Sequence, residues 1–316
     1  NQPIVMKTNI SLILILCLLL GACKNGNASS QSKNETPQDT IKAIKMPAIP
    51  QMMTAPEQRA DFLAKHYWDN VNFADTNYIH HPEVTEQAWA DYCDLLNHVP
   101  LETAQQAMRN VIDRTNVDKK VFTYITDLAD KYLYDPNSPM RNEEFYIPVL
   151  EAMIASPVLD ETEKIRPQAR LKLAQKNRIG TKALNFTYTL ASGAQGSLYQ
   201  LKAEYLLLFI NNPGCQACTE TIEGLKNAPI INQLLQEKKL VLLSIYPDEE
   251  LDEWKKHLSE FPNEWINGYD KKFTIKEEQV YDLKAIPTLY LLDKDKTVLL
   301  KDATAPAIEA YLMQHQ

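Results

Sequence analysis

Two cysteines in the C-terminal half of the chain stand at a spacing that suits redox chemistry. Cys215 and Cys218 enclose two neutral residues, Gln216 and Ala217, and a helical pattern follows them. A cysteine that begins a helix lies beside unpaired backbone N–H groups and the positive end of the helix dipole, which both favour a thiolate. A thiolate attacks disulfides, and a thiol one turn further along can then resolve the mixed disulfide. The position therefore predicts thiol–disulfide exchange, with Cys215 as the nucleophile and Cys218 as the resolving thiol.

The same Cys-x-x-Cys pattern also suits zinc, so the other candidate ligands decide between the two chemistries. No second Cys or His pair stands at the spacing that would complete a tetrahedral site, and neither a metal nor another cofactor is predicted. His80 and His81 are adjacent in a loop and lack metal-ligand spacing. Cys93, between Tyr92 and Asp94, is predicted to pack as a small buried hydrophobe, with a resolving role in exchange as the alternative.

The elements that must position the cysteine pair follow an alternating order of strands and helices. Residues 205–210 are a continuous apolar run, which is typical of a strand buried on both faces of an α/β sheet. That strand leads through a Pro-Gly loop into the cysteines and a helix that extends to about residue 237. The other expected elements are a strand at 185–190, a turn at 193–196, a buried strand at 239–246, helices at 249–260 and 274–281, a hairpin of 288–293 and 297–301, and a helix at 306–313.

This order resembles the TlpA/ResA-like branch of periplasmic thioredoxin folds over residues 178–316. The resemblance rests on the Cys-x-x-Cys at a helix start and on Ile286-Pro287-Thr288 before a hairpin and a last helix. It implies a thioredoxin-like α/β/α three-layer domain around a central mixed sheet, with a redox-active disulfide between Cys215 and Cys218. It also implies a cis bond between Ile286 and Pro287, a form that X–Pro bonds take at small cost, lying against Cys215. The backbone of Ile286 would then pair with the substrate.

The chain departs from the family pattern at several positions around the cysteines. Gly214 stands where Trp is common, and the Gln216-Ala217 spacer replaces Gly-Pro and adds no cation. Because nothing extra stabilises the thiolate, we expect a moderate-to-reducing couple. Phe209 lies near the strand end, where the family has a buried acid. Glu220 is one position early compared with a glutamate of the family, and it is either a proton shuttle or a solvated acid that suits the helix N-terminus.

Residues 53–177 are predicted to form an all-α domain in front of the thioredoxin-like one. The clearest helix is at 119–134, where Val121, Ile125 and Leu128 fall on one apolar stripe. Further helical patterns occur at 58–73, 83–98, 101–113, 143–155 and 161–175. We expect five to seven packed helices with an interior rich in aromatic residues, namely Phe62, Tyr67, Trp68, Trp89, Tyr92, Tyr124, Phe145 and Tyr146. This part resembles the domain of unknown function that often precedes such modules in bacterial lipoproteins.

The first residues predict export and a lipid anchor. An apolar run at residues 10–20 and the Leu-Gly-Ala sequence directly before Cys23 are typical of a signal peptide and resemble the bacterial lipobox. We expect residues 1–22 to be removed and Cys23 to be acylated, with an uncleaved anchor as the alternative. Residues 23–52 are predicted to be a disordered tether, because they carry too little apolar surface to offset the entropy of ordering. These features predict a cell-envelope lipoprotein that is anchored to a membrane and faces the periplasm.

Charge and residue pattern narrow the partners and the activity. The 316-residue chain has a formal net charge of −8 and no block of Lys and Arg, so nucleic acid is not expected as a partner. The pattern predicts an enzyme, a membrane-anchored thiol–disulfide oxidoreductase that reduces or isomerises disulfides of client proteins and is served by an unidentified electron donor. The alternative is a non-catalytic binding module on a thioredoxin scaffold, with the cysteines locked as an inert disulfide. A peroxidase-type site would need Thr or Ser and Arg around a single cysteine, and that set is not found in the sequence.

Overall fold

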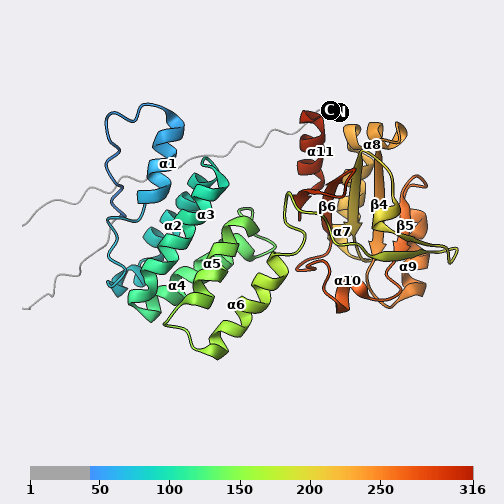
Figure 1. Cartoon of the computed structure of the whole chain (residues 1–316). Coiled ribbons are helices and arrows are strands. Elements are labelled where there is room, and N and C mark those ends of the chain that lie inside the picture. Colours follow the sequence, from blue (N-terminus) through green and yellow to red (C-terminus); the bar gives the residue numbers. More distant parts are fainter. Residues whose placement is uncertain (1–42, 316) are drawn as a thin grey trace, which may run out of the picture. The chain divides into compact units, whose positions relative to one another are not determined.

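The computed structural model describes residues 43–315, which lie in one compact unit of the chain. A helical domain comes first and a mixed α/β domain follows, as predicted (Figure 1). The predicted signal peptide, the predicted acylation site Cys23 and the predicted tether up to residue 42 lie outside the described residues. Within residues 43–315, no helix is both long enough and apolar enough to cross a membrane.

The helical domain has six α-helices between residues 43 and 177, within the expected range. Their bounds are α1 (Pro56–His66), α2 (Pro82–Leu96), α3 (Leu101–Arg114), α4 (Lys119–Ala129), α5 (Glu143–Ala155) and α6 (Glu161–Ala174). Short helical turns are η1 (Thr76–His80), η2 (Thr115–Val117) and η3 (Asp130–Tyr134), the last of which continues α4. α4 begins where the Asp118 carboxylate accepts the backbone N–H groups of Lys120 and Val121. α1 ends before the expected residue 73, because Asp69 and Asn70 favour turns over a helix interior.

Aromatic side chains form the core of this domain, as predicted. Trp89 and Tyr92 are 0% and 1% exposed, and their ring centroids lie 6.1 Å apart. Phe62 and Tyr124 differ from the expectation in being only partly buried. Cys93 is 2% exposed within this core, and burial raises its pKa, so the prediction of a core thiol is confirmed.

Residues 43–52 differ from the predicted tether, which was expected to reach residue 52. Ile44 packs against the helical core, and the backbone carbonyl of Lys45 accepts a hydrogen bond of 2.9 Å from the Asn70 side chain. Because this stretch carries apolar side chains such as Ile44 and Ile49, burial can offset the entropy of ordering it.

The α/β domain is built on a seven-stranded mixed sheet. Its strands are β1 (Thr187–Leu190), β2 (Gln195–Ser197), β3 (Tyr205–Ile210), β4 (Leu240–Tyr246), β5 (Ile266–Tyr269), β6 (Thr288–Asp293) and β7 (Val298–Lys301). They lie in the order β2-β1-β5-β4-β3-β6-β7. β3, β4 and β5 are parallel, and the other neighbours are antiparallel. β3 and β4 are almost wholly buried, as their apolar runs predicted.

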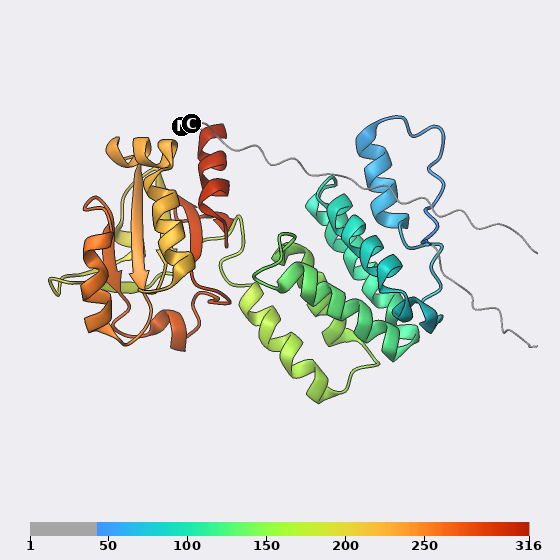
Figure 2. The same ribbon diagram turned by 180° about the vertical axis from the view of Figure 1, so that it is seen from behind.

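Both faces of the sheet are covered, and side chains along β3 alternate between them. The helices are α7 (Gln216–Lys226), α8 (Pro229–Gln236), α9 (Leu251–His257), α10 (Thr274–Glu277) and α11 (Ala305–Gln314), drawn from yellow to red and seen from behind in Figure 2. Leu207 and Phe209 belong to the core shared with α7, α8 and α11. Leu206 and Leu208 belong to the opposite core, which includes Ile275 of α10. The thioredoxin-like layered architecture predicted from the sequence is therefore confirmed.

Some elements of the α/β domain differ from the prediction. The helix after the cysteines ends at Lys226 and a new helix begins at Pro229, because proline lacks an N–H group and disfavours a helical conformation at Ala228. α10 ends at Glu277 although a helix was expected to continue to residue 281. β5 was not predicted, since its four residues include a glycine and an asparagine and do not alternate clearly.

Candidate active site

The cysteine pair lies where β3 passes into α7. β3 ends at Ile210, and a four-residue loop leads to Cys215, the N-cap of α7. Gly214 has a φ of +71°, a left-handed conformation that glycine adopts without a steric penalty, and it turns the chain into the helix. Cys218 falls in the first turn of α7. The local sequence therefore places both thiols at the positive end of one helix dipole.

Cys215 is the accessible member of the pair and faces the segment before β6. Its side chain is partly exposed, and its Sγ lies 3.7 Å from the backbone oxygen of Ile286. The bond between Ile286 and Pro287 is cis, and its contact with Cys215 confirms the arrangement that the resemblance implied. Both Cys215 and Cys218 are free thiols in this structure, and a disulfide between them stays a prediction for the oxidised form.

Cys218 is the buried member of the pair. It is 2% exposed, and burial raises its pKa to about 12, although the backbone N–H of Asn212 acts on this pKa in the opposite direction. The neighbouring Cys215 raises the pKa of Cys218 further. One thiol of the pair is therefore partly accessible and the other is buried, which suits an attacking thiol followed by a resolving one.

Two neutral polar side chains, Asn211 and Ser244, form a hydrogen bond where the cysteine loop leaves β3. Asn211 is 3% exposed, and its amide donates to Ser244 Oγ at 2.8 Å and to the Phe209 carbonyl oxygen at 3.2 Å. Phe209 and Ile210 are fully buried, so the strand end that the family fills with an acid is apolar here. The missing acid is evident from the sequence, whereas the Asn211–Ser244 pair that joins β3 to β4 is seen only in the structure.

Glu220 lies on the exposed side of α7 and accepts a hydrogen bond of 2.9 Å from the Gln216 side chain, one turn earlier. This position fits the solvated acid near the helix N-terminus, which was one of the two interpretations of Glu220. The proton-shuttle role stays a prediction. His81, whose neighbour His80 is exposed, lies 3.0 Å from Glu83 through its Nδ1. In residues 43–315 no group of three or more His, Cys, Asp or Glu side chains could hold a metal ion.

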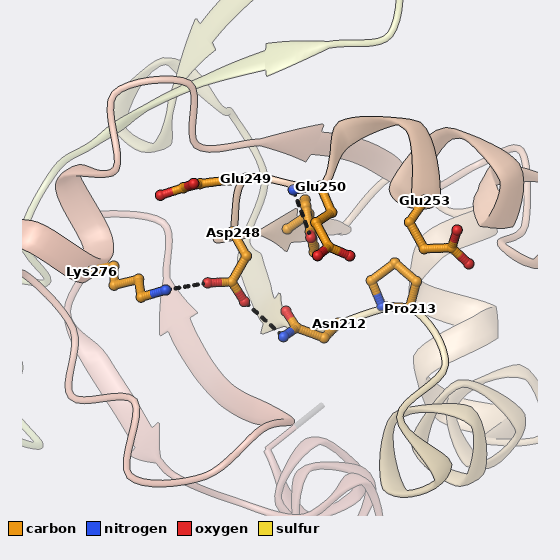
Figure 3. A pocket seen from close by; sticks show the side chains of 8 residues that line it. Asn212, Pro213, Asp248, Glu249, Glu250, Glu253 and Lys276 are labelled. Carbon is orange, nitrogen blue, oxygen red and sulfur yellow. Dashed lines mark hydrogen bonds and ion pairs between the residues drawn. The ribbon is translucent and has the colours of Figure 1, made fainter.

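An acidic pocket of about 470 Å³ opens beside the loop that enters Cys215 (Figure 3). Asp248, just after β4, accepts hydrogen bonds of 2.7 Å from both the Asn212 amide and Lys276 Nζ. Burial opposes ionisation of Asp248, but these two donors outweigh it and lower its pKa. Asp248 thereby holds Asn212, the residue whose backbone N–H acts to lower the pKa of Cys218. The remaining lining residues are Pro213, Tyr246, Glu249, Glu250 and Glu253.

Sequence patterns did not point to this Asp248–Asn212 contact. The sequence contains only an indirect indication of this contact. Asp248 and Asn212 each follow a buried strand, and the ends of two adjacent parallel strands lie at the same edge of a sheet. The pairing of β3 with β4 had to be known before the two side chains could be placed together.

Comparison with solved structures now decides the family. A thioredoxin-like protein from Bacteroides caccae has a crystal structure that is 84% identical to this chain, covers 88% of it and 100% of its own length, and superposes with a TM-score of 0.85. The chain belongs to the thioredoxin-like proteins. The resemblance recognised over residues 178–316 is therefore confirmed for the fold and the family.

Family comparisons divide this thioredoxin-like protein in the same order as its structure. A model described as a domain of unknown function (DUF5106) matches residues 22–177, and one described as thioredoxin-like matches residues 203–298. No curated protein matches the chain.

Two further solved structures are each similar to less than half of this chain. The C-terminal domain of an uncharacterised protein from Bacteroides fragilis is 69% identical, covers 43% of this chain and 98% of its own, and has a TM-score of 0.43. The thioredoxin domain of a thiol-disulfide oxidoreductase from Bacteroides vulgatus is 20% identical, covers 44% of this chain and 97% of its own, and has a TM-score of 0.40.

Proposed function

We propose that this thioredoxin-like protein is a thiol–disulfide oxidoreductase that reduces or isomerises disulfides in client proteins. The observation that carries the proposal is the contrast between two thiols at one helix start. Cys215 is accessible and faces the Ile286 carbonyl, whereas Cys218 is buried one turn deeper. This arrangement supports Cys215 as the nucleophile and Cys218 as the resolving thiol.

The proposed reaction begins with the Cys215 thiolate. It attacks one sulfur of a client disulfide, a bond forms between the two sulfurs, and the other client sulfur leaves as a thiolate that takes up a proton. Cys218 then loses its proton and attacks Cys215 Sγ, which releases the second client sulfur and leaves a Cys215–Cys218 disulfide. A dithiol donor returns two electrons and two protons and regenerates both thiols.

The surroundings of Cys218 support the second step. Burial keeps this thiol protonated in the resting enzyme, because it raises the pKa of Cys218 to about 12. The backbone N–H of Asn212 acts to lower the pKa of Cys218 and so favours negative charge as it develops on Sγ. Asp248 holds the Asn212 side chain and thus the loop that carries this donor.

The neutral spacer supports a moderate-to-reducing couple. Gln216 and Ala217 add no cation beside Cys215, and strong oxidants of this class owe their potential to extra stabilisation of the reduced form. Equilibration of the protein with glutathione measures the potential. A value near that of DsbA, about −120 mV, would contradict this part of the proposal.

The proposed place of action is the periplasmic face of a membrane, reached through a lipid on Cys23. The support is the signal-peptide pattern that ends at Cys23. Growth of the producing bacterium with radiolabelled palmitate tests it. The parent chain is expected to carry label and Cys23→Ala to lose it, whereas a labelled Cys23→Ala chain would reject this anchor.

Two experiments test the exchange activity. In insulin reduction with dithiothreitol, the parent is expected to accelerate precipitation and Cys215→Ser to remain at the background rate. Equal rates for the two chains would favour the non-catalytic binding module. In the native cell, Cys218→Ser is expected to accumulate mixed disulfides through Cys215, and their identification would name the clients and the electron donor.

A further inference from the structure

A buried ion cluster joins the first helical turn of α5 to the segment that precedes Pro287. Lys284 Nζ lies 2.6 Å from Glu143 Oε1, 3.1 Å from Asp282 and 3.9 Å from Asp302. The Lys284 side chain is 7% exposed, and the Glu143 side chain is 13% exposed. The other oxygen of Glu143 is paired with Lys301 at the end of β7, whose side chain is 6% exposed. One carboxylate of the helical domain therefore binds two buried ammonium groups of the thioredoxin-like domain.

The same segment is also held by the chain that connects the two domains. Lys176 Nζ donates to the backbone oxygens of Glu278 and Gln279, at 3.2 and 2.6 Å. Asn177 donates to the carbonyl of Val280 at 2.7 Å. Backbone carbonyls at 278–280 and the side chain of Lys284 are thus all bound by residues that come before the thioredoxin-like domain.

This segment ends at the candidate active site. Ile286, two residues after Lys284, places its carbonyl 3.7 Å from Cys215 Sγ. Glu143 is therefore linked to Cys215 through its ion pair with Lys284 and the two residues of backbone that follow Lys284. A displacement of Lys284 would move the backbone that faces the attacking sulfur.

Burial makes the position of Lys284 depend on Glu143. A desolvated ammonium is stable only where carboxylates neutralise it. The two aspartates beside Lys284 belong to its own domain, whereas Glu143 and the ring of Tyr134, whose centroid lies 5.0 Å from Nζ, come from the helical domain. Without the Glu143 charge, Lys284 and Lys301 lose the acceptor that they share.

We propose that the helical domain is a positioning element for the exchange site, in which Glu143 holds Lys284 and thereby fixes the 278–287 segment against Cys215. Glu143 and Lys284 are positioning residues, since neither touches the reacting sulfurs. The inference rests on the proposed exchange function and gives the helical domain a part in it: presenting a fixed backbone edge to a client polypeptide. A small disulfide reagent, which needs no such edge, should be indifferent to the ion pair.

The test compares variants of the full-length chain by hydrogen–deuterium exchange and by kinetics. Glu143→Gln removes the charge at nearly constant volume, and Lys284→Gln breaks the same contact from the other side while leaving Glu143 paired with Lys301. Glu151→Gln is the matched control, because it makes the same change at an exposed position of α5. Lys284→Arg keeps the charge and is the conservative rescue.

We expect amides at 278–287 to exchange at least about tenfold faster in both Gln variants, with β3 unchanged. The KM for insulin should rise about fivefold with kcat nearly constant, while the rate with a small aromatic disulfide changes less than twofold. Glu151→Gln should match the parent, and Lys284→Arg should restore most of the loss.

An unchanged rate of amide hydrogen exchange at 278–287 in a folded Gln variant would overturn the proposal. Faster amide hydrogen exchange with an unchanged KM for insulin would also overturn it, since the segment would then have no part in client binding. A parent chain that fails to reduce insulin, together with faster exchange in both Gln variants, would reject the oxidoreductase function while supporting the structural link through Glu143.

Discussion

Selective alkylation of Cys218 gives the sharpest test of the roles assigned to the two cysteines. The perturbation is Cys215→Ser, which leaves Cys218 as the only thiol at the start of α7. Cys218 is 2% exposed, and burial, the largest influence on it, raises its pKa to about 12. Cys215 raises the pKa of Cys218 further, so its removal lowers that pKa somewhat without changing the main cause.

The expected magnitude follows from the fraction of thiolate. At pH 7.5 a free cysteine with a pKa of about 8.5 is roughly one-tenth ionised. At the same pH a thiol whose pKa is about 12 is ionised to only about three parts in one hundred thousand. Because only the thiolate is alkylated, Cys218 should react up to roughly three thousandfold more slowly than free cysteine, before any shielding by the protein is counted.

The assay is iodoacetamide labelling followed by mass spectrometry of the Cys218 peptide, with glutathione as the free-thiol reference. The rate should rise about tenfold per pH unit between pH 7.5 and 9.5, with no plateau. In the parent chain, Cys215 should be labelled before Cys218. Labelling of Cys218 within tenfold of glutathione at pH 7.5, or a plateau below pH 9.5, would refute the reasoning from burial.

Three further predictions concern stability, each measured by urea unfolding. Burial opposes the charge of Lys284, but Glu143 and two aspartates outweigh this effect and raise the pKa of Lys284. The stability that the charged lysine adds is therefore present at neutral pH and is lost as pH rises above about 10.5. The difference in the free energy of unfolding between the parent and Lys284→Met should shrink above that pH. Gly214→Ala should destabilise the chain by about 1 kcal/mol because its φ is +71°, whereas Gly224→Ala, within α7, should stabilise it by up to about 1 kcal/mol. Cys93→Ala should lower stability by about 1 kcal/mol and leave insulin reduction unchanged.

Specific outcomes would contradict these predictions. A gap between the parent and Lys284→Met that widens above pH 10.5 would show that the lysine is not held by its carboxylates. Equal effects at Gly214 and Gly224 would remove the argument from backbone conformation. Loss of insulin reduction in Cys93→Ala would support the alternative, a resolving role for this buried thiol.

Local signals account for the parts of the fold that were predicted well. Burial can be predicted from the apolar stripe at 119–134 and from the apolar runs of β3 and β4. The reason is that the spacing of apolar residues follows from which face of an element packs inward. The break before Pro229 was missed although it had a local signal, since proline marks a helix start. β5 had none, because its place in the sheet comes from pairing with β1 and β4 and not from its own residues.

The residues of the candidate site divide in the same way. The positions of Cys215 and Cys218 relative to a helix start, and the contact of Ile286 with Cys215, follow from short motifs in a known order. Their unequal burial does not, because it depends on how α7 packs on the sheet. The Asp248–Asn212 contact likewise needed the pairing of two parallel strands.

The amino-acid sequence alone determined the two folded parts, the order of most helices and strands, and the cysteine pair at a helix start, because each is written in neighbouring residues. Only the tertiary structure decided which charges meet. Glu143 and Lys284 are 141 positions apart, and neither stands in a motif. An ion pair of that kind forms because packing brings two surfaces together, and the residues next to each partner in the sequence do not indicate how close the two partners lie.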